Sequence, residues 1–290
     1  MTVFQDNIRL SSDIFSFLCK NPSGEVLLTT SKGIYLQISS RVLLILDSAY
    51  GVTPIGIGLS HFVDFATAIN PKAGQAVSVS NGCIHFPGGT LKPQWDVVST
   101  ERYSAAPIPQ QIIRCAQLLI GQCSDRSLAH MAAPLLLNQP LSAASQSNPY
   151  CAKALPILEQ LLDALSNDDA ERIHDAVKQL LGLGIGLTPS LDDILLGLLY
   201  GLMRLPRQKA VASILSEAIA TYAPTQTNAI SAAYLNAVAQ GGCFERLDNI
   251  IENLGANAPI NIAPILEIGS SSGSEMLLGL LLAANLITKG

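Results

Sequence analysis

Residues 180–197 read LLGLGIGLTPSLDDILLG, and this stretch sets the organisation of the second half of the chain. A helix is predicted to end at Gly182, because three glycines alternate with aliphatic residues from there on. If this glycine segment is extended, one face is bare backbone and the aliphatic side chains of the other face anchor in the core. Thr188 is expected to cap the next helix, with Pro189 at its first helical position.

A second stretch, residues 269–279, repeats this pattern as GSSSGSEMLLG. It aligns with the first without a gap, at an offset of 82 residues. The matched pairs are Ser190 with Ser272, Asp193 with Glu275, and Gly197 with Gly279. Because a glycine inside a helix costs about 1 kcal/mol relative to alanine, the last pair predicts a tight helix crossing. The repeat therefore predicts two paired structural units, each a polar loop that opens an apolar helix.

Both loops have the composition of an anion-binding site. The first backbone N–H groups of a helix lack intrahelical partners, and the helix dipole adds a partial positive charge. Glycines let a ligand approach the main chain closely, and Ser and Thr hydroxyls add donors. The predicted substrate-binding residues of the loops are Gly184, Gly186, Thr188, Pro189, Ser190, Ser271, Ser272 and Gly273. Their chemistry predicts a small anionic substrate.

Three carboxylates accompany these hydroxyls: Asp192 and Asp193 in the first loop and Glu275 in the second. One interpretation is structural, since Ser272-x-x-Glu275 is a capping box and Ser190-x-x-Asp193 is nearly one. The other is functional: the carboxylates bind Mg²⁺ together with phosphate oxygens, or they hold an N–H group of the substrate. Both interpretations stay open, and no further metal ligands can be assigned.

A third candidate region lies between two predicted helices. Thr227 is placed to cap the second of them, while Asn228 and Ser231 lie three residues apart on one helix face. Ordinary capping is the favoured interpretation, and substrate binding by these three residues is the alternative.

The first 105 residues are predicted to form a β-rich domain, either a sandwich or a small barrel. Short segments rich in β-branched and aromatic residues alternate there with turn formers. The expected strands are Glu25–Thr30, Gly33–Ser39, Val42–Asp47, Ala76–Ser80, Cys83–Phe86 and Trp95–Ser99. Asn81-Gly82 between two of them is a strong signal for a hairpin.

Residues 106–290 are predicted to form a mostly α-helical domain that carries the two loops, which makes the fold class α+β. The chain enters this domain through a linker at Ser104–Pro109. The expected helices, from apolar residues spaced three and four apart, are Gln110–Gly121, Pro149–Leu165, Asp168–Leu181, Lys209–Tyr222, Thr227–Ala239 and Phe244–Leu254.

The composition limits the classes of function. Apolar residues make up 49% of the 290 residues and charged residues only 13%, about half the usual share. This balance predicts helices buried on more than one side and surface covered in a homo-oligomer or a complex. A net charge of −5 argues against nucleic acid as a partner. The longest apolar run, Met276–Ile287, is too short to cross a membrane, and the N-terminus lacks a signal peptide, so the expected location is cytoplasmic.

The segment Gly184-Ile-Gly-Leu-Thr-Pro-Ser-Leu-Asp-Asp193 resembles a bacterial family with the pattern Gly-Pro-Gly-Leu-Thr-Pro-Ser-Gly-Asp-Asp. That family includes the AllH-type subunit linked to oxamate carbamoyltransferase in anaerobic allantoin breakdown. The chain departs from the pattern at Ile185, where the family has proline, and at Leu191, where it has glycine. In the second loop, Glu275 stands in place of the family's usual aspartate, and Ser271 in place of a histidine or another polar residue.

The resemblance implies transfer of a carbamoyl group, from carbamoyl phosphate and oxamate to oxalurate and phosphate or in reverse. Amides and hydroxyls of residues 184–190 then bind phosphate or a carboxylate. Asp192 and Asp193 are the implied catalytic residues, holding an N–H group or a metal ion. Two alternatives are a non-catalytic ligand-binding or assembly subunit that works with other protein subunits, and an unrelated Mg²⁺-dependent enzyme acting on a small phosphorylated substrate.

Overall fold

The computed structural model describes residues 2–98, 105–206 and 209–289, and the chain divides into two compact units. The first unit is Met1–Glu101 together with Gly242–Arg246, and the second is Arg102–Gly241 together with Leu247–Gly290. Ser99, the predicted end of a strand, and Ser104, the predicted start of the linker, lie outside the described residues.

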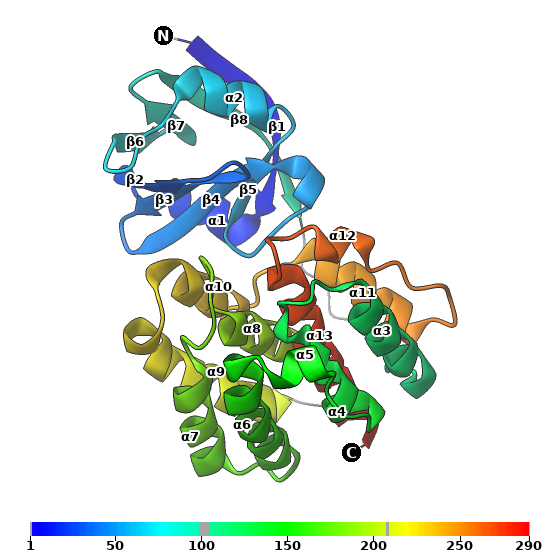
Figure 1. The fold of residues 1–290 in the computed structure, drawn as a ribbon. Helices are drawn as coiled ribbons and strands as arrows, with labels where there is room; N and C mark the ends of the chain where they lie inside the picture. Colours follow the sequence, from blue (N-terminus) through cyan, green and yellow to red (C-terminus); the bar gives the residue numbers. More distant parts are fainter. Residues whose placement is uncertain (1, 99–104, 207–208, 290) are drawn as a thin grey trace. The chain divides into compact units, whose positions relative to one another are not determined.

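The first unit is a closed β-barrel with the strand order β1-β5-β4-β3-β2-β6-β7-β8 (Figure 1). It closes because β1 and β8 pair in parallel over their whole length, from Thr2 opposite Gly89 to Ser11 opposite Val98. The strands are β1 (Thr2–Ser11), β2 (Ser23–Thr29), β3 (Gly33–Ile38), β4 (Arg41–Asp47), β5 (Gly56–Leu59), β6 (Ala76–Ser80), β7 (Cys83–Phe86) and β8 (Gly89–Val98). The predicted fold class is confirmed, and of its two β architectures the small barrel is the one observed.

The predicted hairpin is also confirmed. β6 and β7 pair antiparallel with Ser80 opposite Cys83, so Asn81 and Gly82 form a two-residue turn. Their φ angles are 49° and 70°, as a tight turn of the mirror-image type requires. Alternate residues of β6 are buried, and these side chains join the apolar cluster that fills the barrel. Two helices, α1 (Ser12–Leu18) and α2 (Phe62–Ile69), pack their apolar residues against the same cluster.

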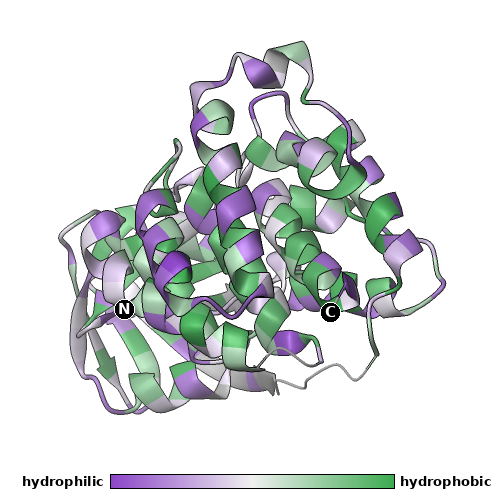
Figure 2. Cartoon of the chain, turned by 90° about the horizontal axis from the view of Figure 1, so that it is seen from below, coloured by the Kyte–Doolittle hydropathy of each residue, from purple (hydrophilic) through white to green (hydrophobic). Residues whose placement is uncertain are grey.

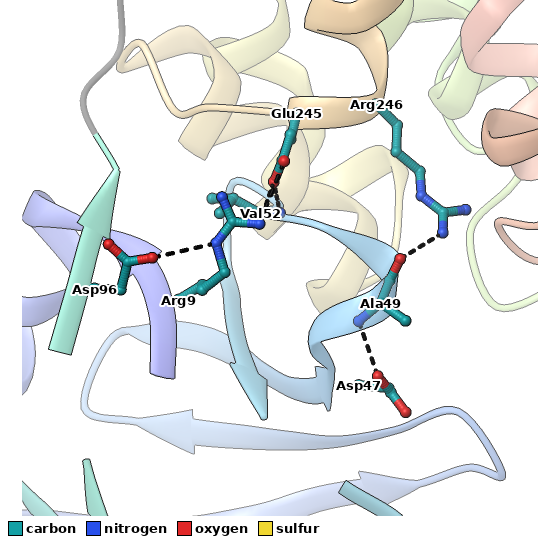
Figure 3. Close-up of polar contacts among 7 residues, drawn as sticks. All are labelled: Arg9, Asp47, Ala49, Val52, Asp96, Glu245 and Arg246. Atoms are coloured by element: carbon teal, nitrogen blue, oxygen red, sulfur yellow. Dashed lines mark hydrogen bonds and ion pairs between the residues drawn. The ribbon is translucent and has the colours of Figure 1, made fainter. Parts of the chain in front are cut away.

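A short segment near residue 245 completes the first unit (Figure 3). Glu245 and Val52 exchange two hydrogen bonds: the Glu245 amide donates to the Val52 carbonyl at 3.0 Å, and the Val52 amide donates to the Glu245 carboxylate at 2.9 Å. The same carboxylate pairs with the Arg9 guanidinium at 3.2 Å. Arg246 donates to the Ala49 carbonyl at 2.9 Å. These bonds attach a segment that is distant in sequence to the loop before β5.

The second unit is helical, and Figure 2 shows hydrophobic residues along most of its helices. The helices that match the predicted ones, to within a few residues at each end, are α3 (Pro109–Gln122), α6 (Pro149–Ser166), α7 (Ala170–Leu180), α9 (Lys209–Gln226), α10 (Ala229–Ala239) and α11 (Glu245–Gly255). The helices opened by the two loops are α8 (Ser190–Arg204) and α13 (Ser272–Lys289). Short elements not predicted are η2 (Leu128–Met131), α4 (Ala132–Leu137), α5 (Ala143–Gln146) and α12 (Ala263–Leu266). Among the described residues, no helix combines the length and the apolar character needed to cross a membrane.

The contact between α8 and α13 is the most extensive one between two described helices. A Cβ added to Gly197 would lie 1.9 Å from the Met276 carbonyl oxygen, and one added to Gly279 would lie 2.0 Å from the Ile194 carbonyl oxygen. These two contacts are related by the same offset of 82 residues as the loops. The glycines therefore let the two backbones touch, and the predicted tight crossing is the observed one.

Replacing Gly197 with alanine is expected to destabilise the protein. The new methyl group meets a backbone oxygen that cannot move alone, so the helices must separate, and overpacking of this kind lowers the free energy of unfolding by about 2–3 kcal/mol. The control is Gly121→Ala in α3, where no atom lies within 4 Å of an added Cβ. Its better helix propensity is expected to raise the stability by up to about 1 kcal/mol. Urea unfolding measures both changes, and equal stability of the two variants would contradict the packing role.

Candidate functional site

The two loops meet at the first turns of α8 and α13. The hydroxyl oxygens of Thr188 and Ser272 lie 3.2 Å apart, although the residues are 84 positions apart in sequence. Thr188 Oγ1 also donates to the carboxylate of Asp193 at 2.9 Å. The predicted loop residues therefore converge, and they do so entirely within the second unit.

The glycine segment of the first loop is curled, not extended. Gly182, Gly184 and Gly186 have φ angles of 77°, 122° and 111°, which side chains with a Cβ rarely adopt. The alternation of faces is lost, so Ile185 and Leu187 are 59% and 41% exposed. The expectation that these aliphatic residues anchor in the core is therefore wrong.

The curled segment leaves backbone donors available. The Leu191 amide donates to the Leu183 carbonyl at 3.0 Å and closes the loop. Within the described chain, no acceptor faces the N–H groups of residues 184–187. Gly186 is exposed, and an added Cβ there would meet nothing closer than 3.4 Å. An added Cβ on Gly184 would lie 2.4 Å from the Ser190 nitrogen, so this glycine serves the packing of the loop itself.

Neither helix starts where its capping motif predicts: α8 starts one residue later than a Thr188 cap requires, and α13 one residue earlier than a Ser272 cap requires. α8 begins at Ser190, and buried Pro189 is its N-cap residue without a side-chain cap, so Thr188 does not cap the helix. α13 begins at Ser272, so Ser272-x-x-Glu275 is not a capping box. A capping hydroxyl must stand just before the helix, whereas both serines already lie in the first turn.

Asp192 accepts three hydrogen bonds and is only 1% exposed. The Gly182 amide donates to its Oδ1 at 2.7 Å, the Ser231 hydroxyl donates to its Oδ2 at 2.6 Å, and the Thr227 hydroxyl makes a short bond to the same oxygen. Thr227 and Ser231 therefore point at Asp192, and they join α10 to the first loop.

Asn228 is the residue that caps α10, where the sequence suggested Thr227. Its Oδ1 accepts from the amides of Ile230 and Ser231 at 3.0 Å. Its Nδ2 donates to the Leu187 carbonyl at 2.9 Å, which fixes the exposed part of the loop. Ordinary capping, the favoured interpretation, is the one observed for Asn228.

Glu275 is the counterpart of Asp193 on α13 and is also 1% exposed. It accepts from the Leu128 amide at 3.1 Å, from the Ser271 hydroxyl at 3.1 Å, and from the Ser190 hydroxyl. Beside it, the hydroxyls of Ser127 and Ser274 lie 2.8 Å apart.

Several of these residues are absent from the sequence prediction. Ser127 and Leu128 come from the segment at η2, more than 140 positions away from Glu275, and no motif marks them. Ser274 is the partner of Asp192 in the internal repeat, which is the only sequence signal for it. In contrast, predicted Gly273 lies outside the cluster: an added Cβ there would meet the Ile265 carbonyl at 1.8 Å, so it packs against α12.

Burial sets the electrostatics of the site. Desolvation raises the pKa of Asp192, Asp193 and Glu275, and Asp193 lies well above its ordinary value because the charge of Glu275 adds to the effect. Hydrogen bonds from the surrounding hydroxyls oppose each shift. No lysine, arginine or histidine contributes to these three shifts.

The arrangement separates two kinds of binding group. Thr188, Thr227 and Ser231 donate their protons to carboxylates. These hydroxyls can therefore accept hydrogen bonds from a ligand but cannot donate to it. The donors without an acceptor in the described part of the loop are the backbone amides of residues 184–187. No group of three or more described His, Cys, Asp and Glu side chains is arranged to hold a metal ion.

Replacing Asp192 with alanine is expected to lower the free energy of unfolding by about 3 kcal/mol, because the Gly182 amide and two hydroxyls lose their buried acceptor. The matched control is Asp175→Ala on the exposed face of α7, with a change below about 0.5 kcal/mol. Chemical denaturation of the two variants measures the difference. A stability of Asp192→Ala equal to that of the control would show that the cluster does not support the loop.

The comparison with known proteins covers both loops of this site, but not Ser127 and Leu128. Residues 180–284 match the model of a family described as oxamate carbamoyltransferase subunit AllH. The match begins just before the first loop and includes α8, α10 and most of α13. No solved structure matches the chain. The resemblance to the AllH family that the loop residues indicate is thus confirmed over residues 180–284.

Proposed function

We propose that this chain is a subunit of an oxamate carbamoyltransferase that acts in allantoin breakdown. The observation that carries the proposal is the meeting of the two loops inside the segment matched by the AllH family. The reaction would convert carbamoyl phosphate and oxamate to oxalurate and phosphate, or run in reverse. Other subunits of the enzyme are then its protein partners, in the cytoplasm.

The geometry suits a substrate that carries both an anionic group and an N–H group. Backbone amides of residues 184–187 would hold the carboxylate of oxamate or the phosphate of carbamoyl phosphate. The lone pairs of Thr188 and Ser272 would accept hydrogen bonds from the amide nitrogen of the same substrate. Such oriented groups place the reacting atoms and stabilise the oxyanion of the tetrahedral intermediate.

Asp192 and Asp193 would act through these hydroxyls. Each carboxyl group is 1% exposed, so a substrate in the loop would contact the hydroxyls above it and not the carboxyl oxygens. The role that fits this burial is positioning: each carboxyl holds two hydroxyls in place, Thr227 and Ser231 for Asp192, and Thr188 and Ser272 for Asp193. We therefore propose these aspartates as positioning residues.

One observation favours an active site completed by another subunit. A phosphate dianion needs positive charge for tight binding and transfer, but no cationic side chain contributes to the electrostatics of the described carboxyl cluster. A partner chain or a Mg²⁺ ion would supply that charge. In this form of the proposal, the chain binds oxamate and its partner provides the cations for carbamoyl phosphate.

The assignment can be tested by activity. The chain is purified alone and together with the proteins encoded beside its gene, and phosphate release from carbamoyl phosphate is measured with and without oxamate and Mg²⁺. Oxamate-dependent release only in the mixture supports a shared active site. Release by the isolated chain would establish catalysis by this chain alone. The absence of release from every combination would reject the carbamoyltransferase assignment.

Thr188→Val is expected to abolish the rise in melting temperature that oxamate causes in the isolated chain. Valine keeps the shape of threonine but removes the hydroxyl that contacts Asp193 and Ser272. Thr221→Val on the exposed surface of α9 is the control and is expected to retain the full rise. Differential scanning fluorimetry over a series of oxamate concentrations measures both. A normal response of Thr188→Val would exclude this hydroxyl from the binding site.

A further inference from the structure

The segment of residues 184–187, with its unpaired amides, is held by a different side chain on each side. Before the segment, the Gly182 amide donates to the Asp192 carboxylate at 2.7 Å. At its far end, Asn228 Nδ2 donates to the Leu187 carbonyl at 2.9 Å. For residues 184–186, the described part of the chain supplies no hydrogen-bond partner. The bond from Asn228 is therefore the one that holds the exposed end of the segment.

The orientation of the Asn228 carboxamide is fixed by its other hydrogen bonds. Its Oδ1 accepts from the backbone amides of Ile230 and Ser231, both at 3.0 Å, and so caps α10. The reversed orientation would place Nδ2 against two N–H donors and Oδ1 against the Leu187 carbonyl, so all three contacts would be repulsive. Because the carboxamide is planar, an oxygen held by two backbone donors leaves Nδ2 little freedom to turn away from Leu187.

The segment does not supply this order by itself. Gly184 and Gly186 have φ angles of 122° and 111°, and glycine has more conformational freedom than any other residue. The side chains of Ile185 and Leu187 are 59% and 41% exposed, so burial does not hold them in one place. If the segment had to become ordered when a ligand binds, the lost entropy would lower the affinity. A hydrogen bond to Leu187 that forms on folding removes this cost.

We propose that Asn228 is a positioning residue of the substrate site, which holds the amides of residues 184–187 in one arrangement before a ligand binds. One end of its carboxamide is bonded to α10 and the other to the loop, and the same turn of α10 is bonded to Asp192 through Ser231 at 2.6 Å. The inference rests on the proposed function, in which these amides bind the carboxylate of oxamate. Positioning replaces the direct contact with the substrate that the sequence suggested as an alternative for Asn228.

Two substitutions separate the positioning role of Asn228 from its capping role. Asn228→Ser keeps an uncharged N-cap residue of similar strength, but the shorter side chain cannot cap α10 and also reach Leu187. Asn228→Asp keeps both acceptor contacts of the cap and loses the donor to Leu187. The matched control is Asn148→Ser, because Asn148 caps α6, which carries neither loop, through the Tyr150 amide at 3.0 Å.

Nitrogen-15 relaxation tests the positioning without any ligand. In wild type and in Asn148→Ser, the amides of residues 184–187 are expected to have order parameters of about 0.85, as in rigid backbone. In Asn228→Ser and Asn228→Asp, the same amides are expected to fall below about 0.6. Order parameters that are equal in wild type and both Asn228 variants would overturn the proposal. An equal loss of order in Asn148→Ser would also overturn it, because that loss would not depend on the bond to Leu187.

Oxamate binding then separates this inference from the proposed function. Titration calorimetry of the isolated chain is expected to give an affinity for oxamate about tenfold lower in Asn228→Ser than in wild type, and an unchanged affinity in Asn148→Ser. Serine is the variant for this measurement because aspartate would add a charge that repels the anion. Loss of order in Asn228→Ser without oxamate binding to wild type would reject the proposed function and retain the support of the loop by Asn228. Equal affinities of wild type and Asn228→Ser would overturn its role in binding.

Discussion

The direct backbone contact between α8 and α13 is the constraint on which the site depends. Gly197 and Gly279 bring each helix against a carbonyl group of the other, so their first turns lie close enough for Thr188 and Ser272 to share a hydrogen bond. Apart from Met203, every residue of α8 is buried, which means that the helix is surrounded on all sides and cannot tilt freely. The carboxyl groups at the start of the helices thereby become interior groups. Burial raises the pKa of each of them, and the hydrogen bonds that they accept oppose the shift.

Burial of three carboxyl groups without a cation is unfavourable for folding, and the structure offsets it with donors. The amides of Gly182 and Leu128 and the surrounding hydroxyls satisfy the oxygen atoms, but an apolar contact of the same shape would be at least as stable. Clusters with perturbed pKa values occur preferentially at functional sites. This cluster is hydrogen-bonded to Gly182 and Thr188, which flank the loop segment with unpaired amides, and this is the reason to connect it with ligand binding.

How much of this could be predicted from the sequence depended on the range of the interactions. The internal repeat is local information, and it predicted the tight crossing of α8 and α13 and the pairing of the two units that the loops open. The Asn81-Gly82 hairpin was also predicted correctly, because its two turn residues are adjacent in the sequence. Strand β5 was missed because it is four residues long and half glycine, and β1 because polar residues interrupt its pattern. Leu128 beneath Glu275, and Glu245 beside Val52, could not be found, since such contacts leave no pattern in a single sequence.

The errors within the loops have a common physical cause. The predicted anchoring of the aliphatic residues required residues 182–187 to be extended, with neighbours alternating between two faces. Three glycines with positive φ break that alternation, expose Ile185 and Leu187, and shift the start of the helix by one residue. The hydroxyls were predicted to cap helices or to bind a ligand, whereas Thr188, Thr227 and Ser231 donate to buried carboxyl groups.

The internal repeat does not make the two loops equivalent. The first loop contributes exposed backbone and three glycines with positive φ, whereas the second contributes serine side chains and has one such glycine, Gly269. Asp192 corresponds to Ser274, so the carboxylate that holds α10 in place has no counterpart on the other side. A pair of symmetric helices therefore carries an asymmetric site. One loop presents backbone donors and the other presents hydroxyl groups, so the proposal that oxamate binds here is consistent with the asymmetry, because its carboxylate and its amide need opposite partners.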